Sequence, residues 1–210
     1  QAVRTHGDSV DLNHLDVSRI TDFSGLFEKS RFNGNISQWD VSSGEQFDHM
    51  FESSRFNGDI SRWDTANATT VAYMFFNSSF QGNVSRWNTG RIKDMSCLFA
   101  CTQFNGDVSQ WDVSNVEWMD EMFSNTVFNG DISQWNTRRV QDMSGMFQDS
   151  MFSGDISHWN VASVVSMARM FDNGAFNGDI AKWNVGNVHD FEQMFQGSRF
   201  AQDISAWQAN

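Results

Sequence analysis

Residues 104–123 read FNGDVSQWDVSNVEWMDEMF, and this stretch determines how the rest of the chain is interpreted. It begins with Asn105-Gly106, a pair that predicts a turn because both residues tolerate positive φ. Trp111 and Val113 follow on either side of one polar residue. This alternation of apolar and polar side chains predicts a very short β-strand.

The second half of the stretch has a different spacing. After Ser114, a residue type that caps helix N-termini, the apolar side chains recur three, three and one residues apart. These are Val116, Met119, Met122 and Phe123. The spacing predicts one buried face of a helix of about two turns. The unit is therefore expected to run turn, strand, short helix and return.

The unit recurs every 24 residues. The same Phe occurs at Phe32, Phe56, Phe80, Phe104, Phe128, Phe152, Phe176 and Phe200, and the same Trp at Trp39, Trp63, Trp87, Trp111, Trp135, Trp159, Trp183 and Trp207. Full units run 8–31, 32–55, 56–79, 80–103, 104–127, 128–151, 152–175 and 176–199, and a partial unit covers 200–210. We expect a single α/β solenoid domain, 1–210, with parallel strands about 4.8 Å apart and short helices on the other side.

Composition limits the possible functions. The net charge of −12 argues against a nucleic-acid or anionic-membrane surface, and no apolar run approaches the roughly 18 residues of a membrane span. Two cysteines, Cys97 and Cys101, are too few for a disulfide framework or a zinc site without other ligands. No catalytic motif is present, so we expect a non-enzymatic protein without a cofactor or metal.

The motif running from Phe104 to Phe123, and again from Phe128 to Phe147, resembles the short repeat of BspA-like bacterial surface proteins. That repeat is also known as the mycoplasma and Listeria lipoprotein repeat and is placed among the leucine-rich repeats. The resemblance implies a parallel sheet on the concave side and a role in adhesion or partner binding, at the cell surface or after secretion. One departure is Val116, which replaces the usual Asn. An alternative polar row is Asn33, Asn57, Gln81, Asn105, Asn129 and Asn177, which we expect to satisfy backbone groups at the turn.

Variable positions are where a partner is expected, because the core positions repeat. Near the predicted strand, five arginines concentrate positive charge on one strip of an acidic protein: Arg62, Arg86, Arg91, Arg138 and Arg139. The strip is a candidate contact surface. The alternative is an ordinary solvated face without a specific contact.

A second candidate surface is aromatic. Tyr73 is the only tyrosine, Phe76 follows the regular Phe75, and Trp118 is the one tryptophan outside the 24-residue series. Aromatic side chains that the repeat does not require are typical interface anchors, although single exposed apolar residues are also common on monomers.

Two acidic rows have a simpler explanation. One is Asp59, Asp107, Asp131, Asp155, Asp179 and Asp203, and the other is Asp16, Asp40, Asp64, Asn88, Asp112, Asn136, Asn160 and Asn184. Carboxylates at such positions cap turns or helix starts by accepting backbone hydrogen bonds, which we favour over cation binding.

The sequence therefore predicts a binding or adhesion module for a protein or glycan partner. One alternative is a structural spacer or self-assembly module, associating end to end through Phe200, Ile204 and Trp207. Another is an ice- or mineral-binding surface. Flat Thr rows would favour it, but Thr65, Thr89 and Thr137 are expected to face inward.

Overall fold

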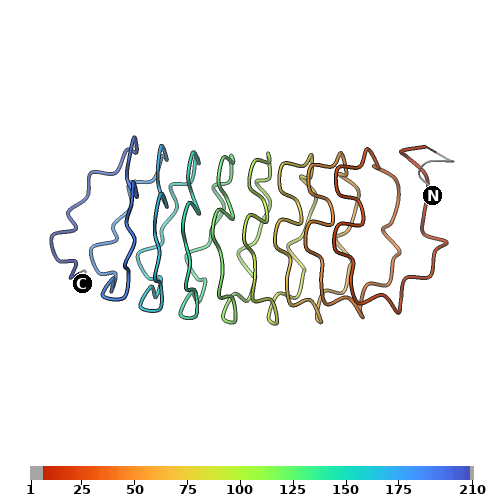
Figure 1. The fold of residues 1–210 in the computed structure, drawn as a ribbon, viewed down its shortest axis with the longest axis horizontal. Helices are drawn as coiled ribbons and strands as arrows, with labels where there is room; N and C mark the ends of the chain where they lie inside the picture. The colour runs from red at the N-terminus through yellow and green to blue at the C-terminus, as the bar shows by residue number, and fades with distance from the viewer. Residues whose placement is uncertain (1–6, 209–210) are drawn as a thin grey trace.

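The 24-residue units form coils that stand side by side in one row. In this computed structural model, which describes residues 7–208, the row runs from the N-terminal coil at one end to the C-terminal coil at the other (Figure 1). Each coil meets the next in register, because parallel bridges join residues 24 apart, such as Asp94 with Trp118 and Trp118 with Asp142. Residues 1–6 and 209–210 of the predicted domain lie outside the described part.

The backbone of each coil differs from the prediction. Residues 7–208 contain no helix, and their only strand pairing is a set of isolated bridges, so the α/β solenoid of strands and helices is wrong. The bridges lie at Trp118 and its equivalents, inside the predicted helix. At the predicted strand the chain turns instead, since the N–H of Trp111 donates to the carbonyl of Val108 at 3.1 Å.

A series of β-turns replaces the helix. We call residues 118–126 and their equivalents the turn ladder. Alternate N–H groups donate to the next coil: Met119 to Asp142, Glu121 to Ser144, Phe123 to Met146 and Asn125 to Gln148, at 2.7–3.1 Å. Between them, Met122 and Ser124 donate to carbonyls three residues back in their own coil. Half of the ladder therefore joins neighbouring coils, whereas a helix would bond only within itself.

The turn ladder depends on left-handed residues, which no regular right-handed helix contains. In the coil of residues 104–127 they are Glu121, with φ of 53°, and Asn125, with φ of 51°. The equivalents of Glu121 are also left-handed: Gly25, His49, Tyr73, Cys97, Gly145, Arg169 and Gln193. The predicted burial is nevertheless confirmed, since Val116, Met119, Met122 and Phe123 are all fully buried. A chain of turns brings nearly the same side chains inward as a helix does.

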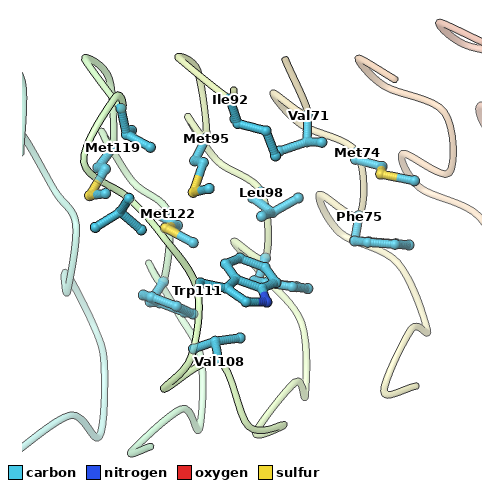
Figure 2. Close-up of a cluster of buried hydrophobic side chains, with 14 of the residues drawn as sticks. Val71, Met74, Phe75, Ile92, Met95, Leu98, Val108, Trp111, Met119 and Met122 are labelled. Carbon is cyan, nitrogen blue, oxygen red and sulfur yellow. The ribbon is translucent and has the colours of Figure 1, made fainter. Parts of the chain in front are cut away.

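The aromatic rows form the core, as predicted. Trp87 and Trp111 stack at 6.4 Å, and Phe104 and Phe128 stack at the same distance. Figure 2 shows Trp111 and Val108 on one side of the interior and Met119 and Met122 on the other. The Trp residues of the 24-residue series, from Trp39 to Trp183, are 3–6% exposed. Each coil thus buries its aromatic side chains against copies of themselves.

The asparagines of the polar row at the opening turn have the expected role. Asn105 Oδ1 accepts the backbone N–H of Asn129, its equivalent in the next coil, at 2.9 Å. The same bond links Asn33 to Asn57, Asn57 to Gln81, Asn129 to Ser153 and Asn177 to Ala201. The side-chain amides therefore continue the hydrogen bonding between coils at this turn.

Candidate functional site

Each coil turns a corner just before the turn ladder, and polar side chains hold that corner. Asp112 Oδ1 accepts the N–H of Ser114 at 2.9 Å. Every equivalent Asp or Asn likewise accepts the backbone N–H of the residue two positions later. Asn115 Nδ2 donates to the carbonyl of Gly90 in the preceding coil at 2.7 Å. Capping was therefore the correct interpretation of this row, although it caps a turn and not a helix.

Two arginines are fixed at the corner by these amides. Arg139 Nη1 donates to Asn115 Oδ1 at 3.0 Å, and Arg91 Nη1 donates to Asn67 Oδ1 at 2.7 Å. In both cases the arginine is 24 residues from its acceptor and thus one coil away. Both guanidinium groups lie on exposed residues with further N–H donors beyond the one that is bound.

Arg138 interrupts a row of small residues. Its equivalents within residues 7–208 are Ser18, Ser42, Ala66, Gly90, Ser114, Ala162 and Gly186. The two following coils have only Ala162 and Gly186 at the position of Arg138, so small residues lie beside the two arginines there. The result is a groove of about 480 Å³, which we call the arginine groove, lined by Glu117, Arg138, Arg139, Gln141, Ala162, Ser163 and Asn187.

Charge in the arginine groove is uneven. Neither Arg138 nor Arg139 forms an ion pair within 4.0 Å among residues 7–208. Glu117 is the one acidic lining residue, and it lies 3.9 Å from Lys93 Nζ and accepts from Gln141 Nε2 at 3.4 Å. Hydrogen bonds from Ser114 hold the pKa of Asp112 below its usual value, and the Arg138 guanidinium lowers the pKa further.

The structure does not bring all five predicted arginines together. Arg138 and Arg139 line the groove. Arg91 lies two coils before Arg139 and is bound to Asn67. Arg62 and Arg86 are exposed four to five positions earlier in their coils, directly before Trp63 and Trp87. The signal for the groove was visible in the sequence as a single Arg138 among Ser, Ala and Gly.

The predicted aromatic residues lie on the turn ladder. Tyr73 stacks on His49 at 4.9 Å between ring centroids and meets Phe76 edge-on at 5.7 Å, and all three are half-buried. Trp118 is 40% exposed and makes no ring contact with another aromatic residue of the described chain. Its equivalents are all polar: Asp22, Gln46, Thr70, Asp94, Asp142, Ser166 and Asp190. The sequence therefore identified three aromatic side chains of the turn ladder, of which Tyr73 and Phe76 are in contact.

The Cys97 thiol and the Tyr73 phenol, both on the turn ladder, are neutral at physiological pH. Burial raises the pKa of Cys97 to about 12, and a hydrogen bond with Cys97 raises the pKa of Tyr73. Both cysteines are free, Cys97 buried and Cys101 half-buried. A thiol with so high a pKa carries almost no thiolate, the reactive form.

The acidic turn row is satisfied locally. Asp107 Oδ1 accepts the N–H of Ser109 at 2.9 Å. The same bond, from the backbone N–H two positions later, is accepted by Asp59, Asp131, Asp155, Asp179 and Asp203. Within residues 7–208, no three His, Cys, Asp or Glu side chains converge as a metal site would require. The row caps turns, as expected.

The last described coil exposes part of its interior. Phe191, Met194, Phe195, Ile204 and Trp207 line an apolar hollow of about 380 Å³ together with two glutamines. End-to-end association through Phe200, Ile204 and Trp207 stays a prediction. No helix of the described residues has the length and apolar character to cross a membrane.

Comparison with known proteins identifies the family. The family described as "Mycoplasma protein of unknown function, DUF285" matches residues 2–99, 76–152 and 126–210, so the chain belongs to it. The three overlapping matches confirm a tandem-repeat protein of the mycoplasma type. They do not extend to the BspA-like or leucine-rich resemblance. No curated protein and no solved structure matches the chain.

Proposed function

We propose that this member of the mycoplasma repeat family is a non-enzymatic module that binds a protein or glycan partner, at the cell surface or after secretion. The observation that carries the proposal is the arginine groove. Arg138 lines it and stands at a position where the seven equivalent residues of the described chain are Ser, Ala or Gly. The fold does not need a long side chain there.

The turn ladder supports the same conclusion independently. Trp118 occupies a position that is polar in every other coil, and 40% of its surface is exposed. Exposing an indole to water is unfavourable, and Trp is enriched among the residues that dominate binding energy. A structural spacer has no need of these two departures from the repeat.

The ice- or mineral-binding alternative has less support. Thr65, Thr89 and Thr137 are buried, as expected, and the Oγ1 of Thr65 donates to the carbonyl of Asn88 at 3.0 Å. These threonines therefore cannot form a flat outer row.

The experiment is an array of glycans and purified cell-surface and matrix proteins, probed with the parent chain and two variants. Arg138→Ser with Arg139→Ser introduces residues found at equivalent corners, and Trp118→Asp introduces the residue found at Asp94 and Asp142. We expect at least one array component to bind the parent and to lose binding in one variant whose melting temperature is unchanged. Absence of any binding, or binding that survives both variants, would contradict the proposal.

A further inference from the structure

We infer that the arginine groove binds a carboxylate-bearing saccharide, a proposal that rests on the binding function above. Two arginines line one groove of a chain whose net charge is −12. Arginine presents planar N–H pairs that match the two oxygens of a carboxylate. The groove is therefore a small positive region on an acidic protein, and we expect it to bind a ligand that carries a single negative group.

Arg139 is positioned for such a ligand before the ligand arrives. One Nη is held by Asn115 Oδ1, and Asn115 is itself anchored to the carbonyl of Gly90. The remaining donors of the guanidinium need no large rearrangement to meet a carboxylate. Fixing a long side chain in advance removes part of the entropy that binding would otherwise cost.

The rest of the groove suits hydroxyl groups. Gln141 and Asn187 carry amides, and the Ser163 hydroxyl donates to the Arg138 carbonyl at 2.8 Å, which leaves its oxygen able to accept. Glu117 accepts hydrogen bonds from hydroxyls but repels a second anionic group. A sugar with one carboxylate among several hydroxyls matches this lining, whereas a run of acidic side chains does not.

The backbone around the groove also disfavours a peptide ligand. The N–H of Gln141 donates to Glu117, that of Val165 to Gln141 and that of His189 to Val165, all at 2.8–2.9 Å. Extended peptides gain affinity by pairing with an open strand edge. Along this side of the groove the backbone N–H groups are already used between coils, so recognition depends on side chains.

The test uses calorimetry at low salt with oligosaccharides containing glucuronate, galacturonate or sialate, each beside its neutral methyl ester. We expect at least one acid form to bind about tenfold or more tightly than its ester, since a charged hydrogen-bonded contact is lost. Arg138→Ser and Arg139→Ser should each weaken that binding by about tenfold. Arg55→Ser removes the same charge from an exposed residue outside the groove, copies Ser79, and should leave the affinity within about twofold.

Each other outcome overturns the inference. These outcomes are failure of all three acids to bind, equal binding of acid and ester, or a stronger effect of Arg55→Ser than of the groove variants. A peptide of alternating Glu and Gly that binds in place of the sugars would reassign the groove to an acidic protein. If the array detects a neutral glycan or a protein while the acids fail, the inference is wrong and the proposed function stands. If the array detects nothing and the acids also fail to bind, both are wrong.

Discussion

The indole N–H of Trp111 donates a hydrogen bond of 3.0 Å to the carbonyl oxygen of Val84, which lies 27 residues earlier in the preceding coil. All the tryptophans of the series, from Trp39 to Trp207, repeat this bond at 2.9–3.3 Å. One side chain therefore fills the interior of its own coil and binds the backbone of its neighbour.

Trp111→Ala should destabilise the chain by roughly 3–5 kcal/mol, because it empties a large buried aromatic site. The loss should extend to adjacent coils, since each coil is supported by its neighbours. Chemical denaturation measures the change, and Trp118→Ala is the matched control, expected to cost about 0.5 kcal/mol or less at its exposed site. Equal losses in the two variants would show that Trp111 does not carry the core.

The left-handed position of the turn ladder makes a second prediction. Gly145 has φ of 61°, and its N–H donates to Ala168 in the next coil at 2.8 Å. Gly145→Val should cost about 1–2 kcal/mol because a β-branched residue disfavours this conformation. Gly145→Asn should cost less, since Asn adopts positive φ readily. If residue 145 lay in a helix, Gly145→Val would instead raise the free energy of unfolding above that of the parent, because Val has a higher helix propensity than Gly.

Acid should weaken the turn caps. Hydrogen bonds from the residue two positions on lower the pKa of Asp59, Asp107, Asp131, Asp155 and Asp203. A carboxylate whose pKa is depressed by folding contributes stability above its unfolded value, near 4, and loses it as the pH falls through the folded value. Burial raises the pKa of Asp48 and Asp120, so these two act in the opposite sense, stabilising at low pH.

The measurement is the melting temperature of the parent between about pH 6 and pH 2, beside a variant with Asn at the five lowered turn positions. The parent should lose stability below about pH 4. The variant should lose less, because Asn83 already accepts the same bond from Ser85 at 2.9 Å without a charge. Identical pH profiles would show that the turn carboxylates do not contribute.

End-to-end association depends on the apolar hollow at the last described coil. Light scattering of the parent at increasing concentration should show a mass above that of one chain, because burial of apolar surface drives association. Replacement of Phe200, Ile204 and Trp207 by Ser should remove the increase. A parent that remains a monomer throughout would exclude this contact.

The sequence by itself determined the repeat length, the buried rows and the local caps. The position of Trp111 or Met119 inside a coil follows from spacing and apolar character, because apolar side chains that recur every 24 residues are buried against the equivalent side chains of the neighbouring coils. The Asp at position 107 could likewise be assigned to its turn, since its acceptor and the donating N–H are two residues apart.

Only the tertiary structure decided the backbone of the turn ladder and the existence of the arginine groove. Spacing specifies which side chains are inside, and a helix and a series of turns bury nearly the same ones. Whether the N–H of Glu121 bonds within its coil or to Ser144 in the next depends on a neighbouring backbone at hydrogen-bonding distance. The groove arises in the same way, because Arg138 and Ser163 are 25 residues apart in the chain and meet only when consecutive coils stack.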